Sequence, residues 1–265
     1  MNFEVLGRGD AAETVLLSSG LGGLGGYWQP QIAALSASFR VILYDQRGTG
    51  RNAEVLDATS ISAMADDVIA VLDGSGTARM HFVGHALGGA IGLDLALRYK
   101  ERLASLVLVN AWARLDPHTA RCFDVRTRIL RDSGVAAYVQ AQPIFLHPAA
   151  WLSAHAERLA EEEVRGVAHF QGVETLLARI GALRGFDVAA RLGAIDTPTL
   201  VMAARDDMLV PWTCSQALAE GIAGASLVVA ETGGHASNVS DPPVFNAALL
   251  GFLMGGPGFM RGPVP

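Results

Sequence analysis

Short apolar runs alternate with helix-like patterns along most of this chain, and this alternation limits the possible folds more than any other feature. Each run is rich in leucine or β-branched residues, as buried strands are. Strands that alternate with helices pair mainly in parallel, and the helices then cover both faces of the sheet. The sequence therefore predicts an α/β fold with a mostly parallel sheet. The predicted strands are Thr14–Ser18, Val41–Asp45, His81–Gly84, Ser105–Asn110, Thr199–Ala203 and Ser226–Ala230.

The segment Ser60–Gly74 shows the helical pattern most clearly. Its apolar residues begin at Ile61 and recur every three or four positions, which is the spacing of one helix face. Asp66 and Asp67 fall between them and are expected to face away from the sheet. The pattern predicts an amphipathic helix packed on the sheet.

Composition favours a single large core. Of the 265 residues, 51% are apolar and 17% are charged, whereas an average soluble chain has about 25% charged residues. A chain of this length buries roughly three quarters of its extended surface on folding. We expect one large domain with an insertion rather than two small domains.

The pattern changes between Trp112 and Leu192. No strand-like run occurs there, and arginine and glutamate become frequent. We interpret this segment as several helices inserted between two strands, forming a lid over the carboxyl edge of the sheet. The chain then divides into a first core part (residues 1–111), a helical lid (residues 112–192) and a second core part (residues 193–265). The tail Gly255–Pro265 is expected to be irregular.

Charge and composition argue against several classes of partner. The formal net charge is −6 and no basic run occurs, whereas nucleic acid is bound mainly through Lys and Arg. The longest apolar stretches reach about half of the ~20 residues that span a bilayer, and the chain does not start with a secretion-signal pattern. Cys122 and Cys214 are far apart, so no disulfide framework or thiolate metal site is predicted. We expect a cytoplasmic protein that binds neither nucleic acid nor membrane.

A glycine-rich stretch follows the first predicted strand. Residues 20–25 match G-x-G-x-x-G, which is also the dinucleotide-binding pattern. In that pattern the glycines open directly into a long helix, but here Pro30 indicates that the next helix starts several residues later. We therefore expect a loop whose backbone N–H groups point at a ligand, and we predict no cofactor.

A second glycine motif surrounds the end of the predicted strand His81–Gly84. Gly84 and Gly88 are separated by three residues. In this pattern, the nucleophile elbow, flanking glycines let a strand and a helix approach closely around a strained central residue. That residue is normally Ser, Cys or Asp, but here it is Ala86. The bend therefore has no nucleophilic atom.

Two later polar residues complete a possible catalytic set. Asp207 follows the strand Thr199–Ala203, and His235 follows the strand Ser226–Ala230. Their order after the elbow is that of hydrolases with an acid and a histidine. We expect Asp207 to orient His235 through Nδ1 and to leave Nε2 free as a base.

Taken together, these motifs resemble the α/β-hydrolase family over nearly the whole chain. Residues 19–23 look like its oxyanion loop with Ser19 in place of histidine, and Asp45–Gly50 matches its D-x-R-G-x-G turn. The chain further resembles the RutD-type hydrolases of bacterial uracil degradation, and this resemblance implies that Ala86 belongs to the family pattern. A serine deliberately changed to alanine is the alternative. The segments that show the resemblance are Tyr44–Gly50, Gly84–Gly88, His118–Phe123, Ala141–Leu146, Ala168–Gly172 and Gly233–Ala236.

This resemblance implies a C–N hydrolase that works without an acyl-enzyme. The expected oxyanion hole is formed by the N–H groups of Leu21 and Leu87, and His235 assists water or relays a proton to the leaving nitrogen. The family's pathway contains two small anions that lose ammonia, carbamate and 3-aminoacrylate. Carbamate is the preferred prediction because its carbonyl-like oxygen suits an oxyanion hole.

A small anionic substrate calls for a cation in the pocket. We predict that Trp112 and Arg114, where the lid leaves the sheet, contact the substrate, whereas Arg47 is expected to brace its own turn. The lid histidines have no metal-ligand spacing, so no metal site is predicted. They are His118, His147, His155 and His169.

Two further interpretations remain open at this point. Loss of the nucleophile is also what a ligand-binding protein of hydrolase fold would show, although such a protein has little use for Asp207 and His235. A serine esterase inactivated at position 86 is the other. The oligomeric state is open as well, and a homodimer through apolar surface is compatible with the composition.

Overall fold

The computed structural model describes residues 1–8, 11 and 13–255. The predicted irregular tail lies, apart from Gly255, outside the described residues.

A seven-stranded sheet forms the centre of the molecule, in the order β1-β3-β2-β4-β5-β6-β7. β1 runs antiparallel to β3, and the other neighbouring pairs are parallel. All six predicted strands are present, with ends that differ by at most two residues, and the predicted fold class is confirmed. The strands are β1 Phe3–Gly7, β2 Thr14–Ser18, β3 Arg40–Tyr44, β4 Met80–His85, β5 Leu103–Val109, β6 Thr199–Ala204 and β7 Ser226–Ala230.

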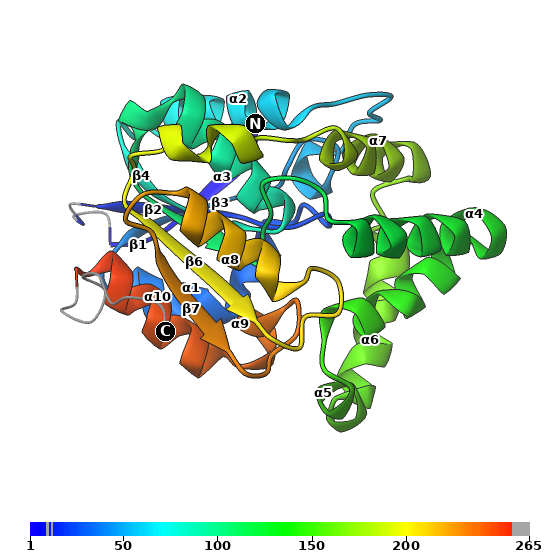
Figure 1. Ribbon diagram of the computed structural model, residues 1–265. Coiled ribbons are helices and arrows are strands. Elements are labelled where there is room, and N and C mark those ends of the chain that lie inside the picture. Colours follow the sequence, from blue (N-terminus) through cyan, green and yellow to red (C-terminus); the bar gives the residue numbers. More distant parts are fainter. Residues whose placement is uncertain (9–10, 12, 256–265) are drawn as a thin grey trace.

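Helices cover both faces of this sheet and create two apolar cores (Figure 1). Alternate residues of a strand enter different cores: Leu16 of β2 lies in one, and Val15 and Leu17 lie in the other. This follows from the two-residue period of a strand. The first core is covered by α2 Ile61–Gly74, α3 Leu87–Arg98 and α8 Trp212–Gly221, and the second by α1 Gln29–Ser36 and α10 Pro242–Leu253.

Helix α2 lies where its sequence pattern predicts. Ser60 caps it by accepting a hydrogen bond from the Ala63 N–H at 3.1 Å. Asp66 is exposed, whereas the Asp67 side chain is largely buried. The Arg47 guanidinium forms an ion pair with the Asp67 carboxylate, so this buried negative charge has a positively charged partner.

Helices α4 to α7 lie between β5 and β6 in the sequence. They are α4 Pro117–Leu146, α5 Ala149–Ala154, α6 Ala156–Ala168 and α7 Val173–Arg184. α4 is broken at Gly134, which has a φ of 83°. Figure 1 shows α4, α5 and α6 beyond one end of the sheet. The end of α4 reaches the loop after β7, where the Ala236 N–H donates to the Leu146 carbonyl.

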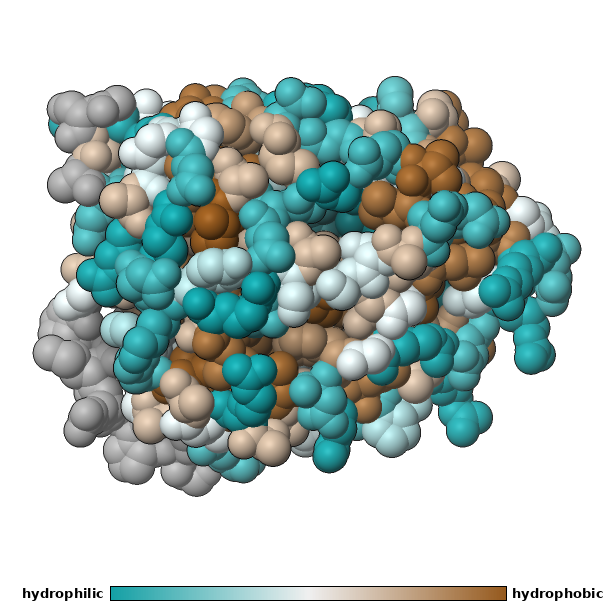
Figure 2. Space-filling view, turned by 90° about the horizontal axis from the view of Figure 1, so that it is seen from above, coloured by the Kyte–Doolittle hydropathy of each residue, from teal (hydrophilic) through white to brown (hydrophobic). Residues whose placement is uncertain are grey.

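The remaining elements are short. They are α9 Ser237–Ser240 and the 3-10 turns η1 Gly25–Trp28, η2 Gly50–Asn52, η3 Lys100–Arg102 and η4 Ala189–Ala194. Within residues 1–8, 11 and 13–255, no helix is both long and apolar enough to cross a membrane. Figure 2 shows apolar residues gathered at the end of the molecule where the lid helices lie. The exposed Val125 and Ile144 of α4, and Val164 and Val167 of α6, are apolar side chains of these helices.

Candidate active site

The sharp bend between β4 and α3 is centred on Ala86. Its φ of 49° and ψ of −104° are strained for a residue with a side chain. The flanking glycines leave no room for a Cβ: one added at Gly84 would lie 2.2 Å from the Gly88 carbonyl oxygen, and one at Gly88 would lie 2.3 Å from the Ser18 oxygen. The chain thus has the elbow geometry that the glycine spacing predicts, with a methyl group at its tip.

Residues 19–23, here called the oxyanion loop, lie against this bend. The Gly88 N–H donates to the Ser19 carbonyl at 3.1 Å. A Cβ built on Gly20 would lie 3.6 Å from the Ala86 methyl carbon. Within the described part of the chain, no residue accepts a hydrogen bond from the N–H of Leu21 or Leu87. These two amides are therefore available as donors beside Ala86.

His235 and Asp207 form a buried pair at the ends of β7 and β6. His235 Nδ1 and Asp207 Oδ2 are 2.8 Å apart, and the two side chains are 2% and 1% exposed. Asp207 Oδ1 accepts from the N–H groups of Leu209 and Val210. An ionised carboxylate only accepts hydrogen bonds, so the proton of the imidazole lies on Nδ1. Nε2 of His235 forms no hydrogen bond with a described residue, and protein atoms do not enclose it completely.

Two side chains hold the main chain of His235, one from the bend (His85) and one from the end of β5 (Asn110). His85 Nε2 donates to the His235 carbonyl at 2.8 Å, and Asn110 Nδ2 donates to the same oxygen at 2.6 Å. Asp206 accepts from the Gly234 N–H at 2.8 Å. Our sequence reasoning missed Asn110 and Asp206 as positioning residues. The available signal was their place directly after, or near the end of, a buried strand.

His85 lies between the bend at Ala86 and the side chain of His235. Its ring centroid is 4.6 Å from that of His235 and 4.9 Å from that of Tyr27. Burial, with a contribution from His235, holds the pKa of His85 well below its usual value. The ring is therefore neutral, and because Nε2 donates to a carbonyl, the buried Nδ1 is an unpartnered acceptor.

The two predicted substrate-binding residues lie in different surroundings. Trp112 is buried, and its indole N–H finds no acceptor among the described residues. Arg114 is exposed, and its backbone forms an isolated bridge with Asp187. This exposed position does not favour Arg114 as the cation that would bind an anionic substrate.

Two other lid arginines are buried and were not singled out from the sequence. Arg126 of α4 is packed among the rings of Phe123, Tyr138 and Phe145, with its guanidinium carbon 5.6–5.8 Å from their centroids. Arg179 of α7 is fully buried. Neither forms an ion pair with a carboxylate among the described residues. Arginine in a helical pattern is usually solvated, so the sequence carried little signal for them.

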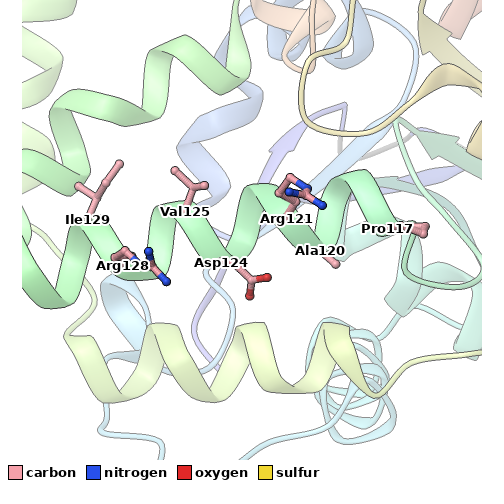
Figure 3. Close-up of a pocket in the computed structure, with 7 residues that line it drawn as sticks. All are labelled: Pro117, Ala120, Arg121, Asp124, Val125, Arg128 and Ile129. Atoms are coloured by element: carbon pink, nitrogen blue, oxygen red, sulfur yellow. The ribbon is translucent and has the colours of Figure 1, made fainter.

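Two grooves lie on the surface of the helices between β5 and β6. One of about 430 Å³ runs along α4 and includes Arg121 and Arg128 (Figure 3). A second of about 580 Å³ lies between α4 and α7. Neither is lined by Ala86, Asp207 or His235. Among the described residues, no group of three or more His, Cys, Asp or Glu side chains is arranged to hold a metal ion.

The fold, the elbow and the paired His235 and Asp207 together define a class of protein. A family model described as "alpha/beta hydrolase fold" matches residues 13–242. The chain therefore belongs to the α/β-hydrolase family, and it is a hydrolase.

Two curated relatives with high sequence identity have names that are more specific than the family. A protein of Agrobacterium fabrum is 56% identical over 96% of this chain and 98% of its own length, and one of Variovorax paradoxus is 57% identical over 96% of each chain. Both are named "Putative carbamate hydrolase RutD".

Solved structures resemble the fold closely. A hydrolase of Pseudomonas aeruginosa is 31% identical with a TM-score of 0.85, over 95% of this chain and 93% of its own. The enol-lactonase of Burkholderia xenovorans is 28% identical with a TM-score of 0.86, over 96% of each chain.

Proposed function

We propose that this hydrolase releases ammonia from a small anion by direct attack of water, with carbamate as the first candidate and 3-aminoacrylate as the second. One observation carries the proposal: the pair of His235 and Asp207 lies beside a bend that has only the Ala86 methyl group. A base is present, but the side-chain nucleophile of an acyl-enzyme route is not. The names of the relatives support carbamate and a role in pyrimidine degradation.

The remaining groups are sufficient for a labile substrate. A serine hydrolase without its triad still accelerates its reaction roughly 10³–10⁴-fold through oxyanion hole and binding. That would not hydrolyse a stable amide at a useful rate. Carbamate and 3-aminoacrylate both break down unaided, so less of the barrier has to be removed.

In the proposed reaction, His235 Nε2 takes a proton from water as the oxygen attacks the carbamate carbon. The Leu21 and Leu87 N–H groups stabilise the charge that develops on the substrate oxygen. The proton then passes to the nitrogen, and the C–N bond breaks. One carbamate and one water give ammonia and bicarbonate. With 3-aminoacrylate, water adds to the carbon that bears nitrogen and the neighbouring carbon takes up a proton; loss of ammonia then gives malonic semialdehyde.

The lid has a place in this proposal. Residues 112–192 would cover the carboxyl edge of the sheet and exclude bulk water from the reacting anion, which strengthens electrostatic interactions inside. The contact between the Leu146 carbonyl and the Ala236 N–H joins the lid directly to the loop that holds His235.

The test is ammonia release from carbamate and from freshly generated 3-aminoacrylate, followed with time, with and without protein. We expect His235→Ala to lower the rate above background at least about 100-fold, the scale of lost general base catalysis. His169→Ala, at an exposed lid histidine, is the matched control and should not change it. An unchanged rate in His235→Ala would remove this residue from the mechanism. Binding of small carboxylates without any turnover would instead identify a ligand-binding protein.

A further inference from the structure

Arg179 of lid helix α7 combines complete burial with the lack of a counter-charge. Its relative exposure is 0%, and no carboxylate of the described residues lies within ion-pair distance. Burial lowers the pKa of the guanidinium to about 10, so it stays protonated at neutral pH. A buried charge without a counter-charge is costly.

The hydrogen bonds of Arg179 go to the main chain around the oxyanion loop. Nη2 donates to the Leu21 carbonyl at 3.2 Å and, more weakly, to the Gly20 carbonyl at 3.5 Å. Nη1 donates to the Arg47 carbonyl at 3.2 Å. The Gln46 side-chain oxygen accepts a third contact from Nη2. The guanidinium thus joins the oxyanion loop to the turn after β3.

These bonds bear on the predicted donor of the oxyanion hole. The Gly20 carbonyl and the Leu21 N–H belong to the same peptide group, so a cation at that oxygen makes the N–H a stronger donor. The loop also packs tightly on the guanidinium, since a Cβ at Gly23 would lie 2.9 Å from Nη2. Gln171 donates to the Leu21 carbonyl at 3.1 Å, which adds a second lid contact to the same loop.

We propose that Arg179 is a positioning residue that holds and polarises the Leu21 N–H donor and whose positive charge makes the site select an anion over a neutral analogue. This inference rests on the proposed function and deepens it, because it assigns both the charge preference and the stability of the oxyanion hole to one lid side chain. The guanidinium acts through the oxyanion loop, and its bonds to backbone oxygens leave the charge uncancelled.

Three variants separate the charge of Arg179 from its geometry. Arg179→Met removes both the positive charge and the hydrogen-bond donors. Arg179→Gln removes the charge but keeps an amide group that can donate hydrogen bonds. Arg179→Lys keeps the charge but cannot bridge the carbonyls of Gly20, Leu21 and Arg47 at once. Arg121→Met is the matched control, because Arg121 is exposed on α4 and has no hydrogen-bond partner among the described residues (Figure 3).

The first measurement is independent of turnover. Dissociation constants of acetate and of its neutral analogue acetamide are determined by ligand-observed NMR. We expect the wild-type protein and Arg121→Met to prefer acetate, Arg179→Met and Arg179→Gln to lose about tenfold or more of that preference, and Arg179→Lys to keep most of it. An unchanged preference in a folded uncharged variant, or no preference in the wild type, would overturn the charge assignment.

The second measurement is the kinetics of ammonia release. Removal of one oxyanion-hole donor lowers kcat about 10²–10³-fold, so a residue that acts through the donor should give less. We expect kcat of Arg179→Lys to fall about tenfold with KM within about threefold. A purely structural role would lower Tm and leave kcat of the folded protein unchanged, and that result would refute the positioning role. No ammonia release by the wild type would count against the proposed function, whereas the binding measurement would still decide the charge preference.

Discussion

At the scale of single residues, the proposed chemistry of this hydrolase depends on the methyl group of Ala86. The motif positions could be read from the sequence because glycine spacing and chain order indicate the elbow, the acid and the histidine. Asn110 also directly follows a buried strand, but that place alone did not show that its side chain holds the His235 carbonyl. Its role comes from a contact between elements that are 125 residues apart in the chain.

Ala86→Ser tests whether the elbow belongs to an inactivated serine esterase. Arg179 is a buried guanidinium without a carboxylate partner among the described residues, and it contacts the oxyanion loop; its charge favours an anion over a neutral ester. We therefore expect Ala86→Ser to raise hydrolysis of p-nitrophenyl acetate by no more than a few-fold. Strong new esterase activity that disappears in the double variant Ala86→Ser/His235→Ala would identify a serine hydrolase instead.

At the scale of elements, the strands with continuous apolar residues could be predicted, and the antiparallel edge strand β1 could not. β1 has a mixed pattern because much of it is exposed at the sheet edge. The long helix α4 is interrupted at Gly134, where the positive φ suits glycine. The pairing of β4 with α3 is the element that matters most for the site, since their close approach creates the bend.

Gly84→Ala should separate these two elements. The added methyl would lie 2.2 Å from the Gly88 carbonyl oxygen. This contact cannot be relieved by rotation of a side chain, because the atoms that the methyl meets belong to the main chain. We expect a loss of about 3 kcal/mol or more in the free energy of unfolding. Gly181→Ala in α7 is the control: its Cβ would meet nothing within 4 Å, and the better helix propensity of alanine predicts a change between zero and a gain of about 1 kcal/mol. Urea denaturation measures both, and equal effects would contradict this account of the elbow.

At the scale of the whole molecule, lid and core meet around His147, which follows α4. Its Nδ1 lies 2.9 Å from Ser240 Oγ of α9, and its ring stacks on Trp151 of α5 at 4.1 Å. Burial, then the nearby Arg158, lowers the pKa of His147 to about 4. The junction therefore requires a neutral imidazole.

This junction predicts a pH dependence of stability. Because the folded pKa lies below the unfolded value near 6.5, the unfolded chain binds the proton first as pH falls. The contribution of His147 is fully present above about pH 6.5 and is lost towards pH 4, with an upper limit of about 3 kcal/mol. We expect His147→Gln, which can keep the bond to Ser240, to make Tm less dependent on pH between 7 and 5. His169→Gln, at an exposed position, should follow the wild type; a wild-type slope in His147→Gln would show that other groups cause the loss.

The parallel sheet, the elbow around Ala86 and the order of Asp207 and His235 could all be predicted before the structure was known. These features depend on local properties: two-residue and helical periodicity, the small size of glycine and the position of polar residues after buried strands. Which arginines are buried became clear only from the packing of the folded chain. Arg126 and Arg179 lie on helices α4 and α7, where Arg126 packs among aromatic side chains of α4 and Arg179 packs on the oxyanion loop, whereas Arg114 lies exposed in the segment before α4. Burial of a charge depends on what the rest of the chain places around it, and that information is not local.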